Sequence, residues 1–189
     1  MATARRIEGY AIVSEDGMLA DANRHMPDGL KVEGDQIFFE QALDGVDVVV
    51  HGRHSQEQQA RAPLRKRLIL TTGVKGIAPD PHNEKARLWN PAGCSFEQAL
   101  DALGAHDPVV AVIGGPLAFA LFIDRYDVFW LSRAPGVRLP GGRPVFPEVP
   151  FMTSEQVLGE HGYEVAERRL LDKPKNVEVV GWRRRAAPA

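Results

Sequence analysis

Five short apolar runs recur along the chain, each bounded by glycine, proline or charged residues. They lie at residues 9–13, 46–51, 67–72, 109–113 and 127–132. Runs of this length that are rich in β-branched or aromatic side chains are typical of strands buried in a parallel sheet. We therefore expect five strands at these positions.

Segments with helical periodicity lie between these strands. In residues 35–43, Asp35 and Phe39 fall on one face by the i, i+4 spacing. Residues 95–103 begin with a serine suited to an N-cap, and residues 116–123 begin with a proline suited to a first helical turn. The alternation of strands and helices predicts an α/β fold with a largely parallel sheet.

The remaining segments predict loops and one hairpin. Residues 73–91 contain glycines and prolines that favour a loop, with a short strand at 86–89. Residues 135–150 have a turn-forming residue at almost every third position, so we expect no helix or central strand there. Strand-like runs at 163–171 and 176–183 predict an antiparallel hairpin that closes one edge of the sheet.

Composition places the chain among ordinary globular proteins, and we expect residues 1–189 to form one domain. The 189 residues are 44% hydrophobic and 25% charged, with 23 Lys+Arg against 25 Asp+Glu. A nucleic-acid binder usually carries a strong basic excess, which is missing here. With a single cysteine, Cys94, and no long apolar stretch or signal-like start, we expect a cytoplasmic protein with no membrane partner. The histidine spacing predicts no metal site.

Glycines follow two of the predicted strands. Gly52 comes after the run at 46–51 and precedes a cation, Arg53, whereas Gly114 and Gly115 follow the run at 109–113. Glycine lets the backbone approach a ligand closely, and the free N–H groups of a following helix attract phosphate. In an open α/β sheet, ligands bind beyond the carboxyl ends of strands, so we expect one phosphate-rich ligand to span these ends. An ordinary tight turn is the alternative, and the G-x-G-x-x-G fingerprint is absent.

The order of several short motifs resembles the dihydrofolate reductase superfamily. The motifs are SEDGMLA at 14–20, Met-Pro at 26–27, an acidic helix from Asp35, HGRHS at 51–55, RLILTT at 67–72, VIGG at 112–115 and VFPE at 145–148. The first is similar to the reductase domain of riboflavin biosynthesis, the C-terminal half of the bifunctional deaminase-reductase. The Met-Pro and Gly-Arg-His-Ser elements are more similar to dihydrofolate reductase itself.

This resemblance implies a dihydrofolate reductase-like domain with a mostly parallel, eight-stranded sheet and an NADPH-dependent reductase activity. It places the phosphates of the cofactor near Arg53, the 2′-phosphate near Thr72 and the nicotinamide beside Ala11 and Ala20. The full implied cofactor set is Ala11, Ala20, Gly52, Arg53, His54, Ser55, Thr71, Thr72, Ile113, Gly114, Gly115, Pro116 and Leu117. A guanidinium fork suits a phosphate, which favours NADP over NAD. Leu117, however, stands where dihydrofolate reductases often have a second arginine.

Reduction of a C=N bond needs a hydride, which the nicotinamide supplies, and a proton. The resemblance implies that a carboxylate on the first helix grips the substrate and assists protonation. Asp35 fits because Phe39 follows it by one helical turn, and Glu33 is the alternative acid. A plain helix N-cap or first-turn acid is the other interpretation of Asp35. Ser132 matches the hydroxyl residue that bonds the acid.

The substrate candidates are Met26, Asp35, Phe39 and Arg65, the last near the place where dihydrofolate reductases hold the folate tail. Asp28 stands where those enzymes usually have a tryptophan. Three hypotheses follow: a reductase similar to 5-amino-6-(5-phosphoribosylamino)uracil reductase of riboflavin biosynthesis, a dihydrofolate reductase, or a family member that binds nucleotide without catalysis. A homodimer is expected because riboflavin-type reductase domains commonly pair.

Overall fold

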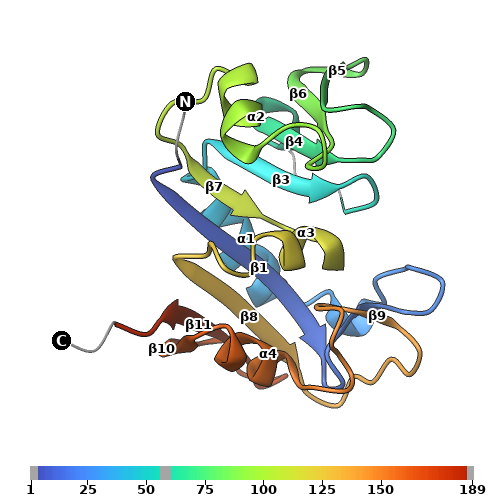
Figure 1. Cartoon of the computed structure of the whole chain (residues 1–189). Coiled ribbons are helices and arrows are strands. Elements are labelled where there is room, and N and C mark those ends of the chain that lie inside the picture. The colour runs from blue at the N-terminus through green and yellow to red at the C-terminus, as the bar shows by residue number, and fades with distance from the viewer. Residues whose placement is uncertain (1–3, 56–60, 187–189) are drawn as a thin grey trace.

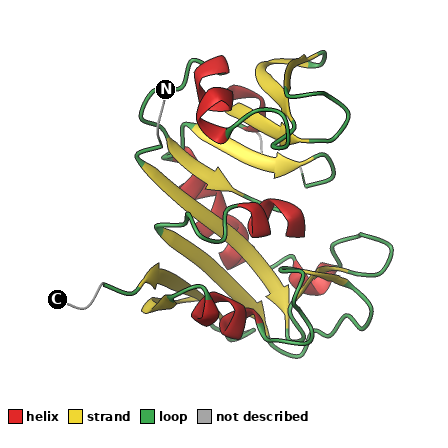
Figure 2. Ribbon diagram, in the orientation of Figure 1, coloured by secondary structure: helices red, strands yellow, loops and turns green. Residues whose placement is uncertain are grey.

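The computed structural model of the protein describes residues 4–55 and 61–186. In this part of the chain, helices cover both faces of a nine-stranded sheet, and a two-stranded sheet lies beside it (Figures 1 and 2). The strands are β1 (Arg6–Ser14), β2 (Met18–Ala20), β3 (Val48–Gly52), β4 (Lys66–Leu70), β5 (Ile77–Asp80), β6 (Asn83–Trp89), β7 (Val109–Val112), β8 (Val128–Ala134), β9 (Arg143–Pro144), β10 (Tyr163–Asp172) and β11 (Val177–Arg184). The helices are α1 (Glu33–Asp44), α2 (Phe96–Ala102), α3 (Pro116–Leu121) and α4 (Ser154–Glu160), with 3-10 turns η1 (Asp28–Leu30) and η2 (Ala62–Leu64).

The main sheet has a parallel centre and antiparallel edges. Its strand order is β10-β11-β8-β1-β7-β3-β4-β6-β5. The pairs from β8 through β1, β7, β3 and β4 to β6 are parallel, whereas β11 pairs antiparallel with both β8 and β10. The central strands therefore all have their carboxyl ends on the same side of the sheet. In open α/β sheets, ligands bind beyond these strand ends.

Alternate side chains of the strands contribute to apolar clusters on both faces of the sheet. Helices α2, α3 and α4 pack on one face against residues such as Ile7 and Val13 of β1. Helix α1 packs on the other face, against residues that include Tyr10 of the same strand. Because both faces are covered, the central strands are continuous apolar runs, as the sequence pattern indicated. Within the described ranges, no helix combines the length and apolar character that a membrane span requires.

The structure confirms the α/β class, the five expected strands and the C-terminal hairpin. The five runs correspond to β1, β3, β4, β7 and β8, and the hairpin is β10 with β11. The N-cap prediction for α2 is also confirmed, because the Ser95 hydroxyl accepts from the Gln98 backbone and the Gln98 side chain returns the bond. Pro116 opens α3 as expected.

The expected number of eight strands is wrong, since the main sheet has nine strands in the described part of the chain. The segment at 73–91, predicted as mostly loop, forms β5 and a longer β6, which pair antiparallel. Pro79 lies in β5, at the edge of the sheet, where a missing N–H removes no bond to a further strand. A proline in such a segment is therefore compatible with an edge strand and not only with a loop.

The sequence analysis also did not predict β2, β9, α4 and the two 3-10 turns. The turn-rich segment at 135–150 contains β9, a two-residue strand that pairs antiparallel with β2. Helix α4 follows this segment, and its N-cap Thr153 makes a reciprocal capping box with Gln156. The spacing of Thr153 and Gln156 is the sequence signal that would have located this helix.

Candidate functional site

The carboxyl ends of β3 and β7 meet through backbone hydrogen bonds. The amide of Gly52 donates to the carbonyl of Gly114 at 2.8 Å, and the amide of Ile113 donates to Val50 at 3.0 Å. The two glycine-containing strand ends that the sequence singled out are thus direct neighbours. The structure brings together segments that are distant along the chain.

Ser55 completes this arrangement from the turn after β3. Its amide donates to the carbonyl of Gly52 at 3.0 Å. A Cβ placed on Gly115 would lie 3.2 Å from Ser55 Oγ, and one placed on Gly52 or Gly114 would lie 3.9 Å from it. We call these four residues, Gly52, Ser55, Gly114 and Gly115, the glycine cradle. Backbone and one hydroxyl line it, because the glycines bring no side chains.

Only glycine suits the second half of the cradle. Gly114 has a φ of +108°, a conformation that residues with a side chain rarely adopt, and the Gly114–Gly115 peptide is cis. A Cβ on Gly114 would also lie 3.2 Å from the Phe119 ring. The glycines therefore let the backbone of this turn pack closely against Phe119, Ser55 and Arg143.

Arg143 reaches the cradle from β9 and was missed by the sequence analysis. A Cβ on Gly115 would lie 3.7 Å from Arg143 Nη2 and 3.9 Å from its Cζ. The backbone of Arg143 pairs with Ala20 of β2, so a predicted nicotinamide neighbour lies beside this arginine. The signal in the sequence was a cation inside the Gly-Gly-Arg-Pro turn, but no local pattern places that turn next to Gly115.

The other predicted phosphate contacts lie at the same edge of the sheet. Arg53 and His54 are exposed in the turn that follows β3. Gly52 pairs with Leu70, so the residues that come next, Arg53 and Thr71, leave the ends of adjacent strands. The Thr71 hydroxyl accepts from the Gly73 amide at 3.0 Å. Thr72, which follows, is exposed.

Helix α3 contributes less than the pattern suggested. It spans six residues, Pro116 is buried, and the Leu117 side chain is 76% exposed. Ile113, the residue before the paired glycines, is partly buried against the α1 side of the sheet. The short helix leaves the glycines and nearby cations as the main features of this turn.

Strand β1 links the cradle to the predicted acid. Its partner β7 pairs with it only as far as Gly9, whereas β8 on its other side pairs as far as Ser14. Within the described ranges, the ladder therefore leaves the β7-facing edge of β1 unpaired beyond Gly9. Ala11 lies in this stretch, one residue before Ile12, which pairs with Ser132.

Asp35 on α1 lies near enough to Ser132 on β8 for the serine hydroxyl to act on its carboxyl. Asp35 is partly buried and Ser132 is 1% exposed. Burial raises the pKa of the Asp35 carboxyl to about 6, and the Ser132 hydroxyl opposes part of this rise because it stabilises the ionised form. The N-cap of α1 is Val32, so the N-cap interpretation of Asp35 is wrong, and both Asp35 and the exposed Glu33 lie in the first turn.

A buried carboxylate that the sequence analysis did not single out supports α1. Glu8 of β1 is 6% exposed, pairs with Arg6, and accepts from Tyr10 Oη and, at 3.1 Å, from Trp130 Nε1. The charge on Glu8 and the burial of Tyr10 both raise the pKa of the Tyr10 hydroxyl, with burial the larger cause.

The aromatic rings that Glu8 holds are the surface on which α1 packs. The Tyr10 ring lies 6.0 Å from that of Phe39, and the Trp130 ring lies 5.4 Å from that of Phe38. Phe39 is therefore a packing residue one turn from Asp35. The sequence signal for Glu8 is an acid inside an apolar strand.

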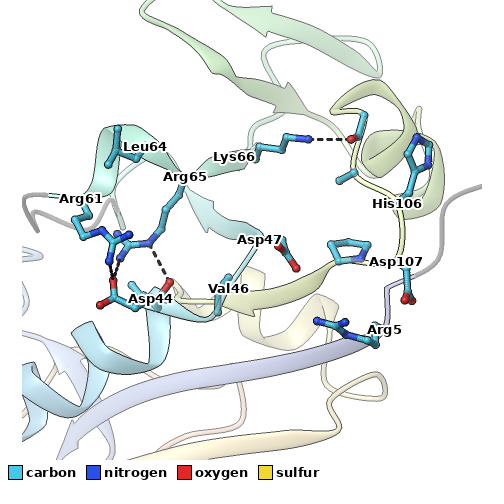
Figure 3. Close-up of a pocket in the computed structure, with 14 residues that line it drawn as sticks. Arg5, Asp44, Val46, Asp47, Arg61, Leu64, Arg65, Lys66, His106 and Asp107 are labelled. Carbon is cyan, nitrogen blue, oxygen red and sulfur yellow. Dashed lines mark hydrogen bonds and ion pairs between the residues drawn. The ribbon is translucent and has the colours of Figure 1, made fainter.

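Arg65, predicted as a substrate residue, is 7% exposed and lies away from the glycine cradle (Figure 3). It precedes β4, at the edge of the sheet opposite the cradle. Its Nε donates to the Leu43 carbonyl at 3.1 Å, and its Nη2 lies 3.3 Å from Asp44 Oδ1. Leu43 and Asp44 end α1, so Arg65 binds one backbone carbonyl and one carboxylate at the C-terminus of this helix. A pocket of about 740 Å³ opens beside it. The remaining substrate candidate, Met26, is 42% exposed in the loop before η1.

Solved structures of three other proteins have a similar fold. A protein assigned to riboflavin biosynthesis, from Shewanella sp. PV-4, aligns with a TM-score of 0.66 and 18% identity over 96% of this chain and 99% of that chain. The diaminohydroxyphosphoribosylaminopyrimidine deaminase/5-amino-6-(5-phosphoribosylamino)uracil reductase of Thermotoga maritima aligns with a TM-score of 0.66 and 15% identity, over 95% of this chain but 56% of that chain. Dihydrofolate reductase from Enterococcus faecalis, complexed with NADP(H) and RAB-propyl, aligns with a TM-score of 0.60 and 18% identity, over 98% of this chain and 100% of that chain.

These alignments show that the chain has the dihydrofolate reductase-like fold that its motifs implied. No protein-family model and no curated protein matches the sequence. At the identities of the structural matches, the likeness concerns the fold. Function has to be argued from the side chains of the site.

Proposed function

We propose that the protein is an NADPH-dependent reductase that transfers hydride to a pyrimidine or pteridine, with 5-amino-6-(5-phosphoribosylamino)uracil as the preferred substrate class. The glycine cradle carries this proposal. Its Cβ positions would meet Ser55 Oγ, and the Arg143 guanidinium lies against it. A dinucleotide diphosphate needs this combination of close backbone approach and positive charge.

The residues around the cradle fit such a cofactor. The proposed phosphate contacts are Arg53, His54, Ser55 and the paired glycines, and the proposed contacts of the 2′-phosphate are Thr71 and Thr72. Ala11 and Ala20 would border the nicotinamide, because one lies on the unpaired edge of β1 and the other pairs with Arg143. When bound, NADPH supplies the hydride.

Asp35 is the proposed acid. With its pKa raised to about 6, its carboxyl holds a proton over a wider pH range than an exposed aspartate does. Ser132 fixes the orientation of the carboxyl, and Phe39 fixes the helix on which it lies. A protonated Asp35 donates to a ring nitrogen, and an ionised one accepts from an amino group. Both are features of pyrimidines and pteridines.

The same Asp35–Ser132 pair makes dihydrofolate the second candidate substrate. Against it stands Asp28, whose side chain is 95% exposed and pairs with Lys31 where a tryptophan would cover a pterin. An exposed ion pair offers no stacking surface for a ring. This favours the pyrimidine substrate over the pteridine.

The proposal is tested by cofactor binding and by turnover. A ligand that binds only the folded form raises the melting temperature, so NADPH should raise it more than NADH at equal concentration. Oxidation of NADPH is then followed with the phosphoribosylamino-uracil and, separately, with dihydrofolate. Asp35→Asn should abolish turnover and leave NADPH affinity unchanged. Glu33→Gln, on the same helical turn, is the matched control and should retain turnover.

Each negative result has a defined meaning. Equal stabilisation by NADPH and NADH would contradict the phosphate assignment of Arg53 and the two threonines. Binding of NADPH without turnover of either substrate would support the non-catalytic hypothesis. Loss of turnover in Glu33→Gln but not in Asp35→Asn would move the acid to Glu33.

A further inference from the structure

Arg143 differs from other arginines that are withdrawn from solvent. Arg65 binds the C-terminus of α1, and Arg133 donates to the carbonyls of Ser14 and Glu15 and pairs with Glu155. The side chain of Arg143 is also only partly exposed. In the ranges that the structure describes, however, it makes no hydrogen bond, ion pair or ring contact.

The Arg143 guanidinium therefore has no anionic partner among the described residues, and its charge is available to a ligand. The position of the guanidinium indicates which kind of ligand it would bind. Nη2 lies 3.7 Å and Cζ 3.9 Å from the Cβ position of Gly115, on the side where Ser55 Oγ lies at 3.2 Å. The guanidinium therefore faces a turn that carries no side chain, beside a hydroxyl donor.

We propose that Arg143 binds the diphosphate bridge of the dinucleotide at the glycine cradle. A planar guanidinium donates in pairs to phosphate oxygens, and an anion is the partner that its position lacks. Leu117 supplies no cation from α3, whereas Arg143 brings one to Gly115 from β9. Because Arg143 pairs with Ala20, the contact lies toward the nicotinamide half of the cofactor. This inference rests on the proposed function.

The test compares two ligands that share the adenosine 2′-phosphate and differ in the diphosphate. Dissociation constants for NADPH and for adenosine 2′-phosphate are measured by calorimetry on the wild type, Arg143→Gln, Arg143→Lys and Arg5→Gln. Arg5 is exposed at the opposite edge of the sheet, just before β1, and its substitution removes the same net charge. We expect Arg143→Gln to weaken NADPH by about 10- to 100-fold and to leave adenosine 2′-phosphate unchanged. Arg143→Lys should recover part of the loss, and Arg5→Gln should bind both ligands normally.

A second readout separates binding from folding. Since Arg143 has no partner in the described part of the free protein, Arg143→Gln should melt no lower than the wild type. Arg133→Gln, which breaks an ion pair, should melt lower. If Arg143→Gln melts at a lower temperature than the wild type, Arg143 has a structural role and the assignment is overturned.

Three outcomes of the binding test overturn the assignment. If Arg143→Gln binds NADPH like the wild type while the wild type prefers NADPH to NADH, Arg143 is not a diphosphate contact and the proposed function stands. If adenosine 2′-phosphate weakens to the same extent, the arginine acts at the other end of the cofactor. If only the KM for the phosphoribosyl substrate rises, and that for its dephosphorylated form does not, the phosphate belongs to the substrate. Failure of the wild type to bind NADPH would instead remove the proposed function itself.

Discussion

Asp35→Asn should stabilise the protein at neutral pH. Burial raises the pKa of Asp35 from 3.8 to about 6, so the folded state holds a proton that the unfolded state has released between these two values. Stability is therefore lost as pH rises through this window, and the loss is complete above about pH 6. A rise of about 2 pKa units corresponds to about 3 kcal/mol, of which about 2 kcal/mol falls between about pH 4.5 and about pH 8.

Asparagine has the same shape but no charge to desolvate, so it removes this loss. The advantage of Asp35→Asn over the wild type should grow by about 2 kcal/mol between about pH 4.5 and about pH 8, or about 4–8 °C in melting temperature. Urea unfolding of both proteins at several pH values measures it, and the titrations of other shared groups cancel in the difference. Glu33→Gln is the control, because its exposed charge at a helix N-terminus is favourable and its removal should cost stability. A stability difference that does not change with pH would refute the argument.

Three further substitutions test the site and the packing around it. Ser132→Ala removes the hydroxyl that stabilises the ionised form of Asp35, so the pKa of that carboxyl should rise above about 6, which carboxyl NMR titration would detect; an unchanged titration would show that the bond has no effect. Gly34→Ala should lower the free energy of unfolding by at least about 2 kcal/mol despite the better helix propensity of alanine, because the new Cβ would collide with the Leu171 carbonyl. Denaturant unfolding measures this loss. An unchanged stability would mean that α1 can shift to make room. Ser95→Ala removes the cap of α2 and should lower stability by about 1 kcal/mol, seen as a fall of about 2–4 °C in melting temperature, whereas no fall would mean that water caps the helix equally well.

The parts of the fold that the sequence predicted are those whose cause is local. Each strand is visible as an apolar run within its own segment, Ser95 marks a helix start through a capping box, and Pro116 marks one because proline suits the first helical turn. Strand β5 was missed because proline usually interrupts a strand. What permits Pro79 here is the edge position of β5, and an edge position depends on the order of strands across the whole sheet.

The candidate site divides in the same way. Glycines at strand ends and an aspartate one helical turn before a phenylalanine are local patterns, and the structure places Gly52 beside Gly114 and Asp35 near Ser132; their roles stay predictions. Arg65 was assigned to the substrate from the resemblance to dihydrofolate reductases. Its burial against the C-terminus of α1 arises from a contact with Leu43 and Asp44, which no local pattern encodes.

Arg143 and Glu8 show why contacts between residues far apart in the chain could not be predicted from the sequence. The role of each charged side chain depends on the residues next to it in the fold. These neighbours are Trp130 for Glu8 and Gly115 for Arg143. Glu8 has found its partners within the chain, so its charge serves packing. The Arg143 side chain makes no hydrogen bond or ion pair with the described residues, and Gly114 and Gly115 beside it carry no side chain that could accept one. Whether a charged side chain stabilises the fold or is available to bind a ligand therefore depends on whether it has a partner within the folded chain. This can be seen in the structure and not in the sequence.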